Sequence, residues 1–227
     1  MPGTATATFL FSDIEGSTRL EGSVGTTRYG ALRERHRAIL RAAFQERHGE
    51  EQGTEGDSFF VTFASARDAV AAAATGQRAL AAEPWPDDGA IRVRMGLHTG
   101  ESESVGGSLV GLDINRASRS AALANGGQIV VSTATRSLVG DALPDGAAWL
   151  DLGDHRLRDL DSTERLWQVS VAGLPDAFPP LRSGTAALGN MPTRLTTFVG
   201  RDQELAEVLA LFAAGRLLTL TGPWRDG

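Results

Sequence analysis

Two aspartates stand beside apolar strand-like runs and could bind divalent cations together. Asp13 follows the run Phe9–Phe11, and Asp57 precedes the run Phe59–Phe63. If the two strands are neighbours in one sheet, both carboxylates reach the same point, and hard oxygen ligands of this kind suit Mg²⁺. Two cations held there could activate an attacking hydroxyl and neutralise a leaving phosphate. Taken singly, an aspartate at such a position is more often a helix cap or a turn residue.

The residues that follow Asp13 add a feature suited to phosphate. Gly16, Ser17 and Thr18 stand at the predicted start of a helix. The first N–H groups of a helix have no partner within it, and they attract anions. With this helix start next to it, Asp13 is better explained as a nucleotide-binding residue than as a simple helix cap.

Asn115 and Arg119 form a second polar pair. They are four residues apart within a predicted helix, so they share one face of it. An Arg can stabilise the charge that develops on a transferred phosphoryl group, and an Asn can hold a sugar oxygen. Considered alone, the pair is better explained as a solvated helix face.

Alternating strand and helix patterns position these residues. The predicted elements are a strand at 6–14, a helix at 26–47, a hairpin at 50–63, a helix at 65–82, a strand at 91–97, a helix at 112–124, a strand at 128–132, a short helix at 133–139 and a terminal hairpin formed by 149–157 and 165–171. This order predicts an α+β fold with a ferredoxin-like βαββαβ core, elaborated at its C-terminal end by a helix and a hairpin. The run Asn125-Gly126-Gly127 predicts a left-handed end for the helix at 112–124.

The composition changes after Val171. Residues 172–197 are rich in Pro and Gly and show little periodicity, which predicts a linker. A helical pattern resumes at 198–211, and 216–220 has the composition of a strand. We therefore predict a domain over residues 1–171, a linker over 172–197 and the start of a further module over 198–227.

The composition excludes several kinds of chemistry. All 22 basic residues are Arg, and the chain has no Cys. Without Lys there is no Schiff base and no P-loop Lys, and without Cys there is no disulfide or thiolate nucleophile.

The net charge of -6 argues against direct binding of nucleic acid. No apolar run of about 20 residues could span a membrane, and the N-terminus lacks the features of a signal peptide, so a cytoplasmic location is predicted.

Four motifs resemble those of class III adenylate and guanylate cyclase catalytic domains. They are FSDIEGST at residues 11–18, EGDSF at 55–59, GLHTGE at 96–101 and GLDINRASR at 111–119. Each motif alone is a weak signal. Four of them in the family's order, within residues 6–171, form a specific one.

The resemblance implies a cyclase that converts ATP, or less readily GTP, to the 3′,5′-cyclic nucleotide and pyrophosphate in intracellular signalling. Asp13 and Asp57, assisted by the Ile14 carbonyl, would bind two Mg²⁺ or Mn²⁺ ions. Asn115 would orient the ribose, and Arg119 would stabilise the pentavalent phosphoryl transition state.

The resemblance also implies partners for these residues. Gly16, Ser17 and Thr18 would contact the substrate. Arg158 is the nearest candidate for a basic group that helps to hold the triphosphate. The family's sites form in a head-to-tail homodimer, in which one subunit supplies the aspartate pair and the other supplies the Asn and the Arg.

Two base-recognising positions depart from the family pattern. Gly53 stands where a Lys recognises adenine, and Ser108 stands where an Asp or a Thr is usual. Gly offers no side chain, and Ser can make one hydrogen bond. Gln52 could take the place of the missing Lys after a shift of one residue in the hairpin. Losing one base-reading donor costs about 1–3 kcal/mol, which weakens base selectivity more than the chemistry.

The C-terminal residues carry a second resemblance. Residues 195–201 and 217–223 look like the entry to an ATPase module that follows cyclase-like domains in large actinobacterial transcriptional regulators. The glycine-rich loop that would come next does not follow, so a truncated module is predicted. Two functions stay open: an active cyclase, or a catalytically weak or inactive cyclase-fold module that dimerises or binds nucleotide within such a regulator.

Overall fold

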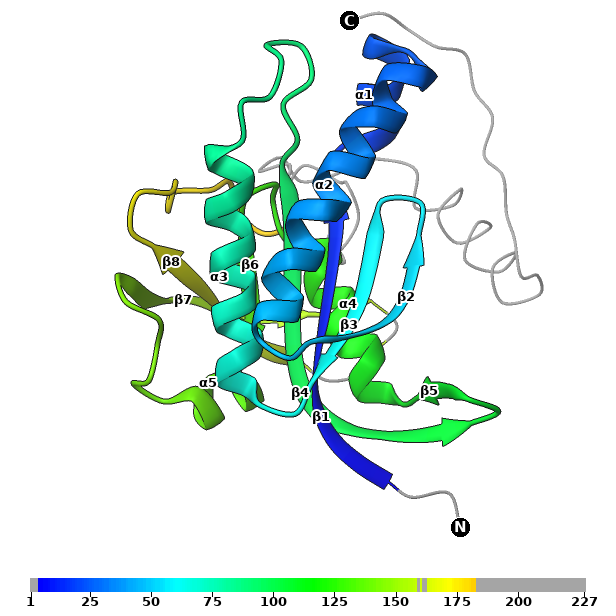
Figure 1. Cartoon of the computed structure of the whole chain (residues 1–227). Helices are drawn as coiled ribbons and strands as arrows, with labels where there is room; N and C mark the ends of the chain where they lie inside the picture. Colours follow the sequence, from blue (N-terminus) through cyan, green and yellow to red (C-terminus); the bar gives the residue numbers. More distant parts are fainter. Residues whose placement is uncertain (1–3, 159, 161–162, 183–227) are drawn as a thin grey trace, which may run out of the picture. The chain divides into compact units, whose positions relative to one another are not determined.

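The computed structural model describes residues 4–158, 160 and 163–182 (Figure 1). The predicted module at 198–227, and the predicted linker beyond residue 182, lie outside these residues. The strands are β1 (Thr4–Ile14), β2 (Glu50–Glu55), β3 (Ser58–Phe63), β4 (Val93–Val105), β5 (Ser108–Val110), β6 (Ile129–Ser132), β7 (Ala147–Arg156) and β8 (Thr163–Val171). The helices are α1 (Ser17–Val24), α2 (Thr26–Glu46), α3 (Ala66–Ala82), α4 (Leu112–Leu123) and α5 (Thr133–Val139).

The strands form one sheet in the order β2-β3-β1-β4-β6-β8-β7, with β5 paired to β4. β1 is antiparallel to both β3 and β4, and β2 is antiparallel to β3. With α2 after β1 and α3 after β3, these four strands form the βαββαβ core that the sequence predicts, so the α+β class is confirmed. β6 is parallel to β4, and the β7–β8 hairpin extends the sheet.

Local sequence explains where several helices begin. The Ser65 side chain accepts a hydrogen bond from the Asp68 N–H at 3.3 Å and caps α3. Ser132 does the same for α5 by accepting from the Thr135 N–H at 3.4 Å. Gly25 separates α1 from α2 with a φ of 82°, which a glycine adopts without strain.

The two faces of the sheet carry different helices. α2 and α3 cover one face, and α4 packs on the other (Figure 1). Leu10 and Ile14 of β1 belong to the main core under α2 and α3 and are almost fully buried. Because successive strand residues point to opposite faces, the residues between them, Phe11 and Asp13, point to the α4 face, where Phe11 packs against the smaller cluster around Phe9.

Most boundaries shift by one or two residues, α1 and β5 are elements for which no range was predicted, and two larger differences affect the surroundings of the site. β4 does not stop at Leu97 but runs to Val105, because its second half pairs with the first residues of β1 and then with β5. The expected left-handed end of α4 is wrong. Ala124 ends the helix in an extended conformation, and the positive φ of 92° comes only at Gly127, whose N–H donates to the Val93 carbonyl at 2.8 Å.

Residues 172–182, which begin the predicted linker, lie against the domain. The Asn125 amide donates to the Pro179 carbonyl at 3.0 Å. The Arg182 N–H donates to the Leu123 carbonyl, also at 3.0 Å. The side chain of Leu181 is buried in a cluster with Leu123. Residues 172–182 therefore pack as part of the domain, although the predicted boundary is at 171.

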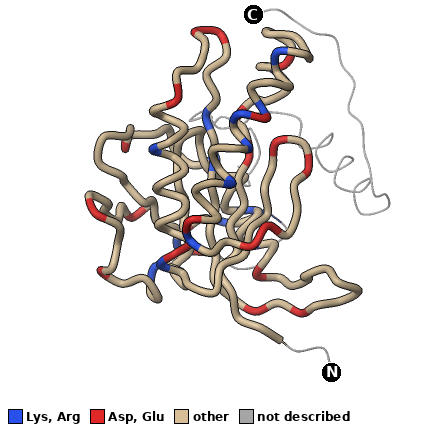
Figure 2. Tube along the Cα trace, in the orientation of Figure 1, with Lys and Arg blue, Asp and Glu red and all other residues tan. Residues whose placement is uncertain are grey.

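Five Arg residues lie on α2, and the other described ones are spread among acidic residues over the rest of the domain (Figure 2). Within the described residues, no helix is both long and apolar enough to cross a membrane.

His36 of α2 is completely buried, and its ring lies 5.9 Å from that of Phe59 in β3. Burial and the positive charge of Arg37 lower the pKa of His36, the Arg33 backbone and Asp13 act in the opposite direction, and the net result is a pKa of about 4. The folded chain therefore holds a neutral imidazole over most of the pH range.

We expect the free energy of unfolding to fall as the pH drops from 6.5 to about 4. An unfolded His36 takes up a proton below 6.5, whereas the folded one stays neutral to about pH 4, so protons favour the unfolded state. The loss should reach on the order of 3 kcal/mol. His36→Phe should flatten the pH dependence of the urea midpoint, while His48→Asn, at an exposed site, should leave it unchanged. Equal pH slopes in His36→Phe and the parent chain would contradict this account.

Candidate functional site

Asp13 ends the row of β1 side chains on the α4 face, and both neighbouring strands orient it. Arg94 is its register partner on β4, and Arg94 Nε donates to Asp13 Oδ2 at 2.9 Å. A second guanidinium nitrogen contacts the same oxygen. Ser58 of β3 donates its Oγ–H to Asp13 Oδ1, also at 2.9 Å. The antiparallel pairing thus places a carboxylate, a guanidinium and a hydroxyl together.

Asp57 lies in the turn between β2 and β3 and comes next to Asp13. The Ile14 N–H donates to Asp57 Oδ2 at 3.2 Å. Burial and, after it, the negative charge of Asp13 raise the pKa of Asp57, whereas a hydrogen bond from the Ser17 hydroxyl lowers it. The structure therefore brings together the two aspartates that the sequence predicts to converge. Two such carboxylates repel each other, and a cation between them would remove that repulsion.

The first turn of α1 lies beside this pair. Gly16 precedes the helix in the left-handed conformation, with φ 67° and ψ 31°. Within the described residues, no side chain caps α1, and its first turn holds no acidic residue. Its leading N–H groups therefore have no side-chain cap, and with the positive end of the helix dipole they form an anion-binding feature. The Ser17 hydroxyl interacts with both Asp57 and Tyr29, which joins this turn to α2.

A cavity of about 180 Å³ opens beside Asp13. Strands β1, β3 and β4 and helix α4 form its walls. The lining residues are Phe11, Ser12, Asp13, Ser58, Arg94, Ser118, Ala121 and Ala122. The cavity is thus small and polar at the end where Asp13 and Arg94 meet.

Two glycines allow α4 to lie directly on β4. A Cβ at Gly96 would come within 2.1 Å of the Ala121 nitrogen, and a Cβ at Gly100 would come within 2.0 Å of the Asp113 carboxylate. The Glu101 N–H donates to that carboxylate at 2.8 Å. The GLHTGE motif therefore shapes the surface on which α4 rests.

His98 lies between these glycines and ties α4 to the sheet. Its Nε2 is 3.3 Å from Asp113 Oδ1, and its Nδ1 is 2.8 Å from Ser132 Oγ. Burial lowers the pKa of His98, although Asp113 acts in the opposite direction. Since Asp113 is in the first turn of α4, these contacts fix the orientation of the helix segment that carries Asn115.

The other predicted residues do not reach the cavity beside Asp13. Asn115 and Arg119 lie on α4, and Asn115 is exposed, but neither lines it. Ser108 lies in the exposed hairpin formed by β4 and β5, and Arg158 follows β7. Of the predicted metal ligands and transition-state residues, only Asp13 lines this cavity in one copy of the chain.

Gly53 lies at a bulge in β2, where the pairing with β3 shifts between Glu51 and Gly53. A Cβ at Gly53 would meet no atom within 4 Å, so the space where a longer side chain would stand is open. Gln52 is the extra residue at this bulge, and its Nε2 donates to Thr62 Oγ1 at 2.9 Å. The bulge thus places Gln52 as the unpaired residue next to Gly53, and its role in base recognition stays a prediction.

A family model described as the adenylate and guanylate cyclase catalytic domain matches residues 1–147, more than half of the chain. The chain belongs to this family. An uncharacterized protein of Mycobacterium tuberculosis is 38% identical to this cyclase-family chain over 210 residues, which cover 91% of this chain and 70% of that protein. A putative adenylate cyclase 3 of Rhizobium meliloti is 28% identical over 166 residues, which cover 72% of this chain and 28% of that protein.

Solved structures of cyclases share the fold. An adenylate/guanylate cyclase/hydrolase from Silicibacter pomeroyi aligns with a TM-score of 0.67 at 24% identity and covers 78% of this chain and 100% of its own. An adenylyl cyclase from P. aeruginosa aligns with a TM-score of 0.63 at 21% identity, covering 80% of this chain and 99% of its own. These likenesses bear on the architecture of the cyclase-family domain.

Two residues at the site of this cyclase-family domain were not predicted from the sequence, Arg94 and Ser58. One signal for Arg94 was available, since Arg92 and Arg94 alternate with apolar residues in the strand predicted at 91–97. That pattern places both Arg side chains away from the core. It does not show that Arg94 stands opposite Asp13, because that depends on the register between β1 and β4.

Asp13 and Asp57 have the donor chemistry of a divalent-cation site in this domain. The described residues contain no group of three or more His, Cys, Asp or Glu side chains that could hold a metal ion. Mg²⁺ in nucleotide-dependent enzymes is commonly held by one or two carboxylates together with water and substrate phosphates. Two adjacent carboxylates beside an anion-binding helix end therefore fit that mode of binding.

We expect Gly96→Ala to lower the free energy of unfolding by at least about 1–3 kcal/mol, because the new methyl group would overlap the backbone of α4. The matched control is Gly30→Ala in α2, where a Cβ meets no atom within 4 Å. That change should raise the stability by about 1 kcal/mol through helix propensity. Urea denaturation of the three proteins measures both effects, and a neutral Gly96→Ala would refute the tight contact.

Proposed function

We propose that this domain is a metal-dependent nucleotide cyclase that converts ATP, or less readily GTP, to the 3′,5′-cyclic nucleotide and pyrophosphate. The observation that carries the proposal is the convergence of Asp13 and Asp57, joined through the Ile14 N–H, next to the uncapped start of α1. Family membership supports the reaction type. The cytoplasmic location predicted from the sequence, and a place in a transcriptional regulator, belong to the same proposal.

In this proposal, Asp13 and Asp57 bind two Mg²⁺ or Mn²⁺ ions, with the Ile14 carbonyl as a further ligand. Bound cations of this type promote deprotonation of the ribose 3′-hydroxyl and neutralise charge on the leaving pyrophosphate. The Asp57 carboxylate is already oriented by the Ile14 N–H and interacts with the Ser17 hydroxyl. Ser58 performs the same orienting role for Asp13.

The substrate phosphates have two binding features next to the carboxylates. The N–H groups at Gly16, Ser17 and Thr18 lie at the positive end of α1, which no side chain of the described residues caps. Arg94 holds Asp13 in the structure, and its guanidinium can turn to a phosphate oxygen once Asp13 binds a cation. An Arg is suited to this exchange because carboxylate and phosphate accept the same forked pair of hydrogen bonds.

Recognition of the base is the least typical part of the proposed site. Gly53 offers only open space, whereas Gln52 presents an amide at the bulge. We propose that Gln52 and Ser108 replace the usual base-reading pair. An amide both donates and accepts hydrogen bonds, so this pair would discriminate less between adenine and guanine than a charged residue does.

We propose that a second copy of the chain completes each site. Asn115 is exposed on α4 and open to a partner, and the cyclase family to which the chain belongs supports shared sites. Large apolar side chains are exposed near them on the β4–β5 hairpin and at the start of α4. These are Val105, Val110 and Leu112, at 56, 45 and 67% exposure. A head-to-tail homodimer would cover apolar surface of this kind and form two shared sites.

A second candidate function is a cyclase-fold module that dimerises or binds nucleotide without efficient catalysis. The open space at Gly53 favours it, because the side chain usual for adenine recognition is absent there. Retention of both aspartates and of Arg119 favours the enzyme. The experiment that follows separates the two functions.

We expect purified protein to form cyclic nucleotide from ATP or GTP in the presence of Mn²⁺. Asp57→Ala should lower the rate at least about tenfold to a hundredfold. Losses of this size follow even when only a residue that orients a metal ligand is removed. Asp87→Ala, at an exposed position with no predicted role, is the matched control and should retain the parent rate. Absence of product above the Asp57→Ala level with either nucleotide, at concentrations that drive dimerisation, would reject the enzyme and favour the binding module.

Mixing two inactive variants tests the shared site. In a heterodimer of Asp13→Ala and Arg119→Ala chains, one site combines both changes and the other has neither. Random pairing at equal concentrations should therefore restore about one quarter of the parent activity per chain. Failure of this rescue, with heterodimers demonstrated by two affinity tags, would remove the shared-site mechanism while leaving the fold and the metal ligands unaffected.

A further inference from the structure

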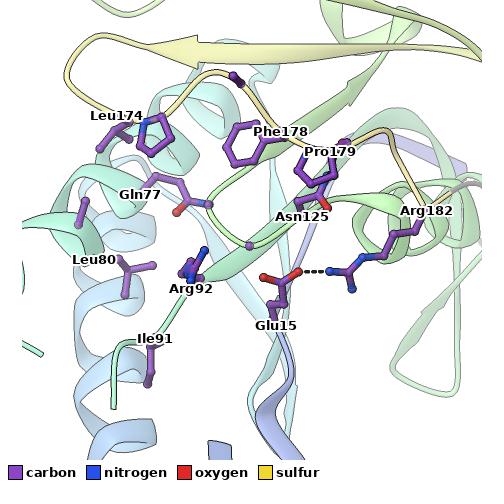
Figure 3. Close-up of a pocket in the computed structure, with 15 residues that line it drawn as sticks. Glu15, Gln77, Leu80, Ile91, Arg92, Asn125, Leu174, Phe178, Pro179 and Arg182 are labelled. Carbon is purple, nitrogen blue, oxygen red and sulfur yellow. Dashed lines mark hydrogen bonds and ion pairs between the residues drawn. The ribbon is translucent and has the colours of Figure 1, made fainter. Parts of the chain in front are cut away.

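A cavity of about 400 Å³ lies between α3, the start of β4, the turn after α4 and the segment 172–182 (Figure 3). Leu80 of α3 and Ile91 before β4 form one side, and Phe178 and Pro179 of the C-terminal segment form the opposite side. None of its lining residues is shared with the cavity beside Asp13. It is therefore distinct from the proposed catalytic site.

The C-terminal segment is a fixed wall of this cavity. It is held before Phe178 by the Gln168 amide, which donates to the Asp176 carbonyl at 2.8 Å. It is held after Phe178 by the Asn125 amide on the Pro179 carbonyl. These anchors keep Phe178 facing α3, so the cavity is built into the fold.

The walls suit an apolar ligand body. Leu80 and Ile91 are almost fully buried, and the opposite wall consists of Leu174, Phe178 and two prolines. Small-molecule sites typically have volumes of about 300–1,000 Å³, with mostly apolar walls and a few convergent polar groups. The cavity has the size and the lining of such a site.

The rim of the cavity carries an excess of positive charge. Arg182 is paired with Glu15 (Figure 3). Arg92 lines the same cavity, and within the described residues its side chain makes no hydrogen bond or ion pair. A neighbouring cavity of about 640 Å³ shares Glu15, Arg92 and Arg182 and adds Arg19, whose side chain is likewise unpaired among the described residues. Two guanidinium groups, Arg92 and Arg182, thus line the cavity with one carboxylate, Glu15, which favours an anion.

We propose that this cavity binds a small amphipathic anion, an aryl or alkyl carboxylate. Its apolar part lies between Leu80 and Phe178, and its carboxylate accepts hydrogen bonds from Arg92. A guanidinium binds a carboxylate through two parallel N–H···O bonds, and Arg92 has this fork available. Binding requires neither nucleotide nor metal, so the proposal is independent of the cyclase activity.

The experiment measures binding by isothermal titration calorimetry with the full chain and no nucleotide. The probe is 4-phenylbutyrate, and 4-phenylbutan-1-ol is its uncharged match. We expect saturable binding of the carboxylate and at least tenfold weaker binding of the alcohol. Arg92→Gln should weaken carboxylate binding roughly tenfold or more, the usual effect of losing a hydrogen bond to a charged group. Arg67→Gln, which removes an exposed Arg on the same helix as Leu80 but outside the cavity, should leave it unchanged.

A second variant locates the ligand. Ala81 lines the cavity, so Ala81→Phe should fill it and abolish binding of 4-phenylbutyrate. Undiminished binding by Ala81→Phe would overturn the proposed location, because it would place the anion in the neighbouring cavity at Arg19. Absence of saturable binding, or equal weakening by Arg92→Gln and Arg67→Gln, would overturn the site altogether. None of these results depends on whether the chain forms cyclic nucleotide.

Discussion

The antiparallel register of β1 with β3 and β4 is the constraint on which the rest of the site depends. Because side chains alternate between the faces of a sheet, a shift of one residue would turn Asp13 into the apolar core under α2 and α3. Burying an unpaired carboxylate there is costly. The correct register instead puts Leu10 and Ile14 into that core and sets Asp13 opposite Arg94. Core packing thus selects the position of the charged groups.

The close approach of α4 to β4 is the second constraint, and it also acts through the sheet. Gly96 and Gly100 remove the Cβ atoms that would overlap the helix. With α4 seated on β4, the neighbouring part of the same face is covered less fully. There Phe11 stacks on Phe60, with ring centroids 4.6 Å apart and an interplanar angle of 6°, and both residues are only half-buried. The placement of α4 on β4 therefore fixes the orientation of Asn115 and leaves an aromatic surface beside Asp13.

Local patterns in the sequence predicted most of the fold and the aspartate pair. Strand and helix periodicity, with turn residues at the boundaries, gave nearly every element, and the approach of Asp57 to Asp13 followed from the neighbouring strands. Contacts between distant segments were not predictable in this way. The bond between Arg94 and Asp13 depends on register. The segment at 172–182 has a linker composition, yet its Pro179 carbonyl is held by Asn125, a residue far away in the sequence.

The charge balance at Asp13 links cation binding to nucleotide binding in the proposed enzyme. Two carboxylates and the Arg94 guanidinium give the site a net charge of about minus one, and a guanidinium stays protonated throughout the pH range of a folded protein. Divalent cations alone would compete with Arg94 for Asp13. A triphosphate alone would approach two unneutralised carboxylates. When both arrive, the cations bind the carboxylates and Arg94 binds phosphate, so every charge has a partner. The site therefore favours the metal–nucleotide complex over either component alone.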